Sequence, residues 1–247
     1  MKNHTCLPLF LSLACAATTA GLSAAEITVH ATADAYIRGD SVNGNGGTSS
    51  PLIVGQLASS GSNDMRALLH FDFSGVSIPA GATVNSVKLV LTVSGTDPND
   101  GDAEVSLDLH QMTTSWSENE VTWNSASTGV TWTTSGGGGD YNSPALATTN
   151  VPTRKNGVYT WESTTLSGIV NTAISDNSTL DLLLKSSDET GTLRTLLRFL
   201  SREPGIATAP RLVIDYTPAA IPEPVTTALL LGGVCLGGVV LCRRFHK

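Results

Sequence analysis

Apolar and polar residues alternate along several short segments, and this alternation constrains the fold more than any other feature. In residues 87–93 and 105–109 every second residue is Val or Leu, with polar residues such as Lys88 and Asp108 between them. A period of two places each apolar set on one face of a β-strand. Further short strands are predicted at residues 26–30, 35–38, 52–54, 67–73, 179–185, 196–200 and 211–216. Turns rich in Gly, Asn and Ser separate these segments, which predicts an all-β fold, an antiparallel β-sandwich.

One segment follows a helical period instead. Its apolar residues recur at spacings of three and four, as on the buried face of a helix. They are Leu166, Ile169, Val170, Ala173 and Ile174. We therefore expect one short amphipathic helix at residues 165–175, lying over the sandwich.

The central region, residues 26–220, is acidic and contains no cysteine. The four cysteines are Cys6 and Cys15 near the start and Cys235 and Cys242 near the end. The core, aided by a metal if one binds, must therefore hold the domain together. This region has 10 Lys and Arg against 20 Asp and Glu, a net charge of −10, which disfavours nucleic acid and anionic lipid as partners. The charge also argues against a strongly acidic glycan, unless calcium or a local basic patch mediates.

Residues 1–25 have the features of a secretory signal peptide. A charged start at Lys2 is followed by an apolar run from Leu7 to Ala17, and residues 23–25 (Ser-Ala-Ala) form a small-residue cleavage site. We expect cleavage after Ala25 and export of the following residues. A first membrane anchor is the alternative, although the apolar run is short and broken by a proline.

The last segment, residues 221–247, predicts a membrane-spanning helix with a marked start and end. Pro222, Glu223 and Pro224 precede an uncharged apolar stretch over residues 225–242, and Arg243 and Arg244 follow it. At about 1.5 Å per residue, a helix over this stretch is roughly 27 Å long, near the minimum for crossing a bilayer. The cations after it predict that this end lies in the cytoplasm.

This order of features resembles the PEP-CTERM sorting signal of Gram-negative bacteria. The resemblance implies that an exosortase, a membrane transpeptidase, recognises the Pro-Glu-Pro motif of an inner-membrane precursor and removes the span. The mature protein would then reach the cell surface or its exopolysaccharide matrix. A simple C-terminal anchor in the membrane is the alternative.

Motifs across the central region resemble the DNRLRE domain. In order, they are residues 33–37 (ADAYI), 66–72 (RALLHFD), 78–84 (IPAGATV), 116–118 (WSE), 121–124 (VTWN), 201–203 (SRE) and 210–212 (PRL). The resemblance covers about residues 28–217 and implies a jelly-roll sandwich that is usually noncatalytic. Related modules bind carbohydrates, including alginate. Members are often appended to enzymes, whereas no partner enzyme domain is predicted in this chain.

Trp132, Arg202 and Glu203 are the candidate ligand-binding residues. Tryptophan rings can stack on sugars, and Trp132, beside a run of four glycines, is the tryptophan best placed to be exposed. Trp116 and Trp123 are expected in the core. Arg202 and Glu203 follow a predicted strand, and they either bind a ligand or form an internal hydrogen-bonded corner.

Asp34, Asn43 and Asn45 are candidate calcium ligands. Carboxylate and amide oxygens are the ligands that calcium prefers, and the two asparagines lie in a Gly-rich loop shortly after Asp34. A solvated turn is the alternative. The acidic turn at residues 97–102 lacks the Gly and distal Glu spacing of an EF-hand and is interpreted as a turn.

The sequence contains no recognisable catalytic motif of the serine-hydrolase, phosphate-loop or zinc type. His70 and His110 alternate with core residues and are expected to face outward. A carboxylate pair for glycoside cleavage, such as Glu118 with Glu203, would meet only in the fold and stays open. Three functions compete: a noncatalytic, glycan-binding surface module, which we favour; a purely structural matrix protein; and a polysaccharide-degrading enzyme.

Overall fold

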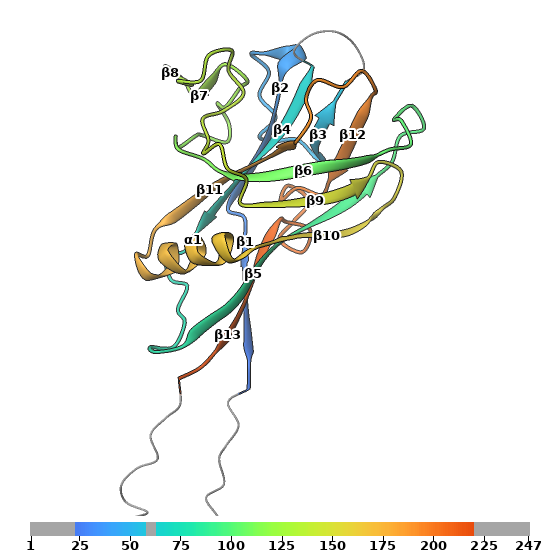
Figure 1. Cartoon of the computed structure of the whole chain (residues 1–247). Coiled ribbons are helices and arrows are strands. Elements are labelled where there is room, and N and C mark those ends of the chain that lie inside the picture. The colour runs from blue at the N-terminus through green and yellow to red at the C-terminus, as the bar shows by residue number, and fades with distance from the viewer. Residues whose placement is uncertain (1–22, 58–62, 220–247) are drawn as a thin grey trace, which may run out of the picture.

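The computed structural model describes residues 23–57 and 63–219 (Figure 1). These residues form β1 (Ala25–His30), β2 (Ala33–Arg38), a 3-10 helix η1 (Gly39–Ser41), β3 (Leu52–Gln56), β4 (Asp64–Asp72), β5 (Thr83–Gly95), β6 (Glu104–Gln111), β7 (Ser125–Ser127), β8 (Val130–Thr131), β9 (Ala147–Pro152), β10 (Gly157–Glu162), α1 (Thr164–Ser175), β11 (Thr179–Ser186), β12 (Thr195–Phe199) and β13 (Arg211–Thr217). Residues 1–22 of the predicted signal peptide (1–25) and the whole predicted tail (221–247) lie outside the described residues. No helix among the described residues is long and apolar enough to cross a membrane.

The strands form one antiparallel sheet that curls into two facing layers (Figure 1). Its order is β1-β13-β5-β12-β3-β4-β11-β6-β9, while β10 pairs with β5 and β2 pairs with β4. A small separate hairpin joins β7 and β8. The prediction of an all-β antiparallel sandwich with a single helix is confirmed in the described part of the chain.

Residues from alternate positions of the strands form the main core between the layers. Leu69, Phe71 and Leu89 are fully buried there, as their period of two predicts. Trp161 joins them from β10. Its ring meets Phe199 edge-on with 6.1 Å between centroids, and its indole N–H donates a hydrogen bond to the Leu107 carbonyl oxygen at 2.9 Å.

The helix α1 lies where the helical period predicted it. It buries Leu166, Val170 and Ala173, and it packs mainly against β5. Its start is fixed by Ser163, whose side-chain oxygen accepts a hydrogen bond from the Leu166 N–H at 3.0 Å. Such a cap satisfies one of the backbone N–H groups that the first turn of a helix leaves unpaired.

The segment 113–141, which follows β6 and contains β7 and β8, covers the outer face of β2, β4 and β11. Leu68 lies on this outer face because its neighbours Ala67 and Leu69 point into the main core. The covering segment buries a second apolar cluster against the face. The cluster comprises Ala35, Ile37, Leu68, Met112, Val121, Trp123, Ala126, Trp132 and Leu183. The described sandwich therefore has a third partial layer that no strand pattern predicted.

The pairing of β1 with β13 brings the two ends of the described chain to the same end of one ladder. Ala25 lies opposite Tyr216 at one end of this ladder, and His30 lies opposite Arg211 at the other. At about 3.3 Å per residue the ladder spans roughly 17–20 Å. In Figure 1 the two strands run together from the body of the sandwich to both ends of the described chain.

We expect Asp140 to make the stability of the covering segment dependent on pH. This buried carboxylate accepts hydrogen bonds from the N–H groups of Thr133 and Thr134 at 2.9 and 2.7 Å and from the Thr114 hydroxyl at 3.0 Å. Burial opposes ionisation, but these hydrogen bonds outweigh it and hold the pKa of Asp140 well below its usual range. A lowered pKa in the folded state gives stability that is complete above the unfolded-state pKa of about 4 and is lost as the pH falls towards the folded-state pKa.

Asp140→Asn should therefore lower the free energy of unfolding by about 1–3 kcal/mol at pH 7. The difference from the wild type should shrink between pH 4 and pH 2. Urea unfolding at a series of pH values measures this difference, and a difference that stays constant over that range would contradict the role given to the ionised carboxylate.

Candidate functional site

Four charged residues from distant parts of the sequence meet beside the start of β2. Asp34 belongs to β2, Glu118 to the covering segment, and Arg202 and Glu203 to the turn between β12 and β13. One oxygen from each of the three carboxylates lies within 4.8 Å of the other two. We call these four residues the Asp34 cluster.

Hydrogen bonds and ion pairs fix the Asp34 cluster. The backbone N–H of Arg202 donates to Asp34 Oδ2 at 2.8 Å, and the backbone N–H of Asp34 donates to Glu118 Oε1 at 2.9 Å. The Arg202 guanidinium Nη1 donates to both Glu118 oxygens, at 3.0 and 3.2 Å, and lies 3.7 Å from Glu203 Oε1. The three segments are therefore tied to each other through their charged groups and their backbones.

Asp34 is the innermost member of the Asp34 cluster. Its side chain is fully buried, Glu118 is half-buried and Glu203 is the most exposed of the three carboxylates. Burial raises the pKa of Asp34 to about 8; the backbone N–H of Arg202 opposes this shift, while the charges of Glu203 and Glu118 add to it. Oδ1 of Asp34 is buried and has no hydrogen-bond partner among the described residues.

The Gly-rich loop after η1 positions Glu118. Asn45 donates from Nδ2 to the carbonyl oxygens of Glu118 and Val121, at 2.8 Å each. Gly47 contacts the Glu118 backbone so closely that a Cβ atom at position 47 would overlap the Glu118 carbonyl. Asn45 is thus a positioning residue for the cluster.

The three residues predicted as calcium ligands have different hydrogen-bond partners in the structure. The amide oxygen of Asn45 accepts a hydrogen bond from the Gly47 N–H at 3.1 Å. The amide oxygen of Asn43 accepts one from the Asn124 side chain at 3.1 Å. Asp34 lies in the Asp34 cluster, whereas the amides of Asn43 and Asn45 hydrogen-bond to neighbouring loops. The other carboxylates of the Asp34 cluster are Glu118 and Glu203.

Arg202 also borders a hollow of about 280 Å³ on the surface. The other residues that line it are Ala31, Thr32, Ile206 and Ala209. Ile206 is 70% exposed, an unusual position for a large apolar side chain. The hollow lies at the end of the β1–β13 ladder far from the chain ends, since the Ala31 N–H donates to the Pro210 carbonyl there, at 2.8 Å.

The prediction that Trp132 is exposed is wrong. Trp132 is only 6% exposed and donates its indole N–H to the Thr122 carbonyl at 3.0 Å. Trp123 is buried beside it, as expected, and Trp116 is partly buried against the same cluster. The cause is the covering segment, which folds back onto β2 and β4, so that these indole rings fill the space between the two layers.

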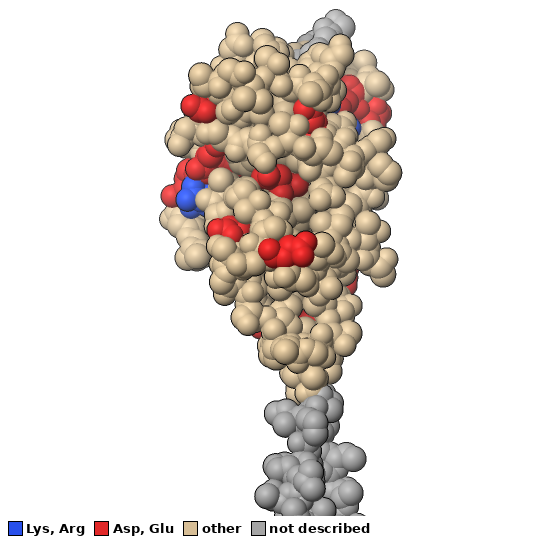
Figure 2. Space-filling view, turned by 90° about the vertical axis from the view of Figure 1, so that its left-hand side faces the viewer, with Lys and Arg blue, Asp and Glu red and all other residues tan. Residues whose placement is uncertain are grey.

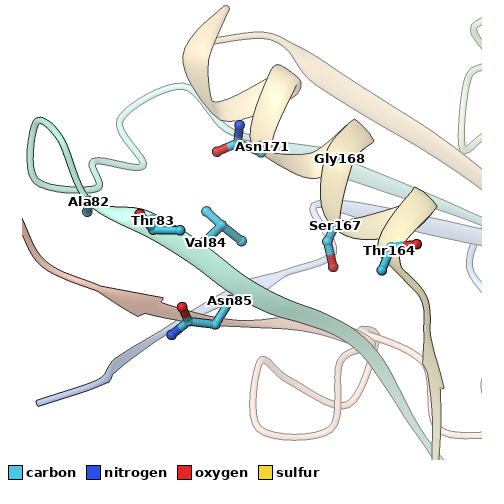
Figure 3. A pocket seen from close by; sticks show the side chains of 8 residues that line it. All are labelled: Ala82, Thr83, Val84, Asn85, Thr164, Ser167, Gly168 and Asn171. Carbon is cyan, nitrogen blue, oxygen red and sulfur yellow. The ribbon is translucent and has the colours of Figure 1, made fainter.

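A second, larger hollow was not predicted from the sequence (Figure 3). It has a volume of about 450 Å³ and lies between α1 and the start of β5. Its lining is uncharged and mixes hydroxyl and amide groups with apolar ones, and Figure 3 shows the side chains of Asn171 and Ser167 on α1 across from Val84 at the start of β5. A run of small polar residues is common on exposed helix and strand faces, so the sequence offered no signal that distinguishes this hollow.

Acidic side chains are spread over the face shown in Figure 2, where basic side chains are few. This distribution follows from the acidic composition of the chain. Several arginines are instead held in ion pairs, as with Arg194 and Arg198 against Asp97 and Asp100. Asp97 and Asp100 belong to the predicted acidic turn, and these ion pairs give that turn a structural role.

Comparison with protein-family models shows which family the sandwich belongs to. The model of carbohydrate-binding module family 96 matches residues 25–216. The chain belongs to carbohydrate-binding module family 96. The match begins at the first residue of β1 and extends into β13, so the family 96 module includes both hollows and the Asp34 cluster. A search of curated proteins found no match to this sequence.

Membership of family 96 answers part of the functional question. The sandwich is a carbohydrate-binding module, a class defined by binding rather than by catalysis. The favoured prediction from the sequence, a noncatalytic glycan-binding sandwich, is supported at this level. Among the surface hollows of the described residues, one is bordered by a guanidinium and an exposed aliphatic side chain, and another by uncharged side chains of α1 and β5.

Proposed function

We propose that this chain is an exported surface protein whose family 96 module binds a polysaccharide without cleaving it. The family match over the whole sandwich is the observation that carries this proposal. The predicted signal peptide and sorting tail support export, and they are features of the sequence alone.

We place the sugar in the hollow beside Arg202. A guanidinium offers several N–H donors in a fixed plane, which suits the hydroxyl or carboxylate oxygens of a sugar. Ile206 provides exposed apolar surface beside it, and Thr32 adds an exposed hydroxyl. Sugar rings have both polar edges and apolar faces, so this combination can contact both. The neutral hollow beside α1 is the competing location.

Three alanine variants at exposed positions separate these locations. Ile206→Ala removes apolar surface from the Arg202 hollow, Asn171→Ala removes an amide from the α1 hollow, and Val158→Ala is a matched control on β10, where the side chain is 59% exposed. Affinity electrophoresis in gels that contain polysaccharide should show binding by Ile206→Ala weakened about fivefold or more, which corresponds to about 1 kcal/mol. The control should stay within twofold of the wild type.

The outcome of that comparison is decisive in either direction. Weakening by Asn171→Ala alone would move the site to the α1 hollow. Binding that is unchanged in all three variants would place the sugar on neither hollow and would contradict our assignment.

The enzyme alternative fits the Asp34 cluster less well. Both oxygens of Glu118 accept hydrogen bonds from Arg202, and Asp34 is buried away from any substrate. A general acid needs a proton within reach of the substrate, whereas these carboxylates face each other and the arginine. A structural matrix protein remains the second candidate, and retention of a polysaccharide by the chain distinguishes the two.

The tail supports a further step of this proposal, removal of the span by an exosortase. The apolar stretch over residues 225–242 is short and rich in Gly, which makes it a marginal permanent anchor. Intact mass of the surface-localised protein should show that the mature chain ends close to Pro222. Glu223→Ala should leave unprocessed precursor in the inner membrane. Mature protein that retains residues 225–247 in a strain with an exosortase would identify an ordinary anchor.

A further inference from the structure

Two independent observations at the Asp34 cluster point to a bound cation. The first is the convergence of three carboxylates, whose oxygens lie within 4.8 Å of one another. The second is the burial of Asp34, whose Oδ1 receives no N–H or hydroxyl donor among the described residues and has the Glu203 carboxylate within hydrogen-bonding reach of the same side chain. Buried polar atoms in folded proteins are nearly always paired, so this oxygen calls for a partner, which is either a proton shared with Glu203 or a cation.

The charges of the Asp34 cluster fit a divalent ion. Asp34, Glu118 and Glu203 together carry three negative charges when ionised, and Arg202 neutralises one through its contacts with Glu118 and Glu203. Two negative charges remain, around the buried oxygen of Asp34. Mutual repulsion among carboxylates this close is unfavourable unless a cation or a proton offsets it.

We propose that Asp34, Glu118 and Glu203 form a calcium site. All the donors are oxygens, which favours a hard cation over zinc or copper. Calcium holds oxygen ligands about 2.3–2.6 Å away, so ligand atoms around the ion lie up to roughly 5 Å apart, and the three carboxylate oxygens lie within 4.8 Å of one another. Magnesium demands stricter octahedral geometry and gives up its water ligands reluctantly, so a site built from protein carboxylates favours calcium.

The site would link three segments that are distant in the sequence. It joins β2, the covering segment and the turn that borders the Arg202 hollow. Bound calcium therefore adds a tie between the covering segment and the sandwich. This inference does not depend on sugar binding, because it concerns only the Asp34 cluster.

Calorimetric titration of the chelator-treated full-length chain with calcium chloride tests the proposal. Asp34→Asn and Glu203→Gln each remove one charged ligand with little change in shape, and the amide introduced at position 34 keeps an oxygen that can accept the Arg202 N–H. Glu162→Gln is the matched control, since Glu162 is an exposed carboxylate on β10 paired with Lys88 at 3.5 Å. We expect calcium to bind the wild type and to raise its melting temperature. Both cluster variants should bind calcium at least tenfold more weakly than the wild type does. The calcium affinity of the control should stay within twofold of the wild-type value.

The same titration with magnesium chloride should show weaker binding. Melting curves without calcium show whether the variants fold, and if Asp34→Asn fails to fold, Glu203→Gln alone decides. The proposal would be overturned if the wild type in millimolar calcium showed neither a heat of binding in the titration nor a change in its melting temperature. So would cluster variants that bind calcium as well as the control does. Neither result would affect the test of polysaccharide binding.

Discussion

Arg66→Met should lower the free energy of unfolding by about 3–5 kcal/mol, the typical loss when one partner of a buried ion pair is removed. Arg66 lies on the outer face of β4, is 8% exposed, and donates through Nε and Nη2 to both oxygens of Glu189, at 2.8 and 2.7 Å. Its Nη1 donates to the Gly138 carbonyl at 2.6 Å. The guanidinium also lies over the ring of Trp123, 4.8 Å from its centroid.

The reason for so large an effect is that Arg66 joins the covering segment to the sandwich. Methionine retains much of the side-chain volume but leaves the Glu189 carboxylate with only Lys185, at 3.2 Å, as its cationic partner, and leaves the Gly138 carbonyl without its donor. Arg38→Met is the matched control, because Arg38 pairs with Asp40 at a more exposed site and exposed pairs contribute about 0–1 kcal/mol. Urea unfolding measures both variants. If Arg66→Met and Arg38→Met lowered the free energy of unfolding equally, the buried hydrogen bonds of Arg66 would add no more stability than a surface ion pair does.

Trp161→Ala should also destabilise the chain by about 3–5 kcal/mol, the usual range for deletion of a large buried aromatic side chain. Trp161 is fully buried between the layers, where it packs against Phe199 and donates to the Leu107 carbonyl. Alanine would leave a cavity in the core and a buried carbonyl without its donor. Thermal and urea unfolding should register the loss.

Val158→Ala provides the comparison on the same strand. Val158 points outward from β10 and is 59% exposed, so its replacement should change the free energy of unfolding by no more than about 0.5 kcal/mol. A similar stability for the two variants would mean that the position of Trp161 in the core is wrong.

The strand pattern predicted most of the sandwich because its physical cause is local. Leu69 and Phe71 face the core as a period of two requires, and the apolar spacing at Leu166 and Val170 predicted the helix to within one residue of its start at Thr164. These signals depend only on neighbours along one strand or helix. The strand and helix periods do not predict which outer faces of the sheet another segment of the chain will cover.

The covering segment is where the sequence-based expectations fail. His110 faces away from the main core, as its alternation predicts, yet it is only 4% exposed because Tyr141 packs against it with 4.7 Å between ring centroids. Trp132 is buried for the same reason, and Arg66 is buried although it alternates with core residues. The segment from residue 113 to 141 has only two short strands, so neither period reveals that it packs back onto the sheet.

The candidate site was predicted in pieces. Asp34 was singled out for its carboxylate beside a polar loop, and Arg202 and Glu203 for their place after a strand. Their assembly depends on contacts between residues 84 and 168 positions apart. For Glu118 the sequence indicates a motif position and one half of a possible carboxylate pair, but nothing in its neighbourhood indicates that Asn45 positions it beside Asp34. Such long-range convergence is a property of the fold.

The most direct test of the central claim is affinity electrophoresis of the full-length chain through gels that contain neutral or uronate-rich polysaccharides. We predict retardation in at least one gel, relief of that retardation by free oligosaccharide of the same type, and no shortening of the polysaccharide after incubation. Migration that is unchanged in every gel would contradict the claim that this family 96 module binds a polysaccharide.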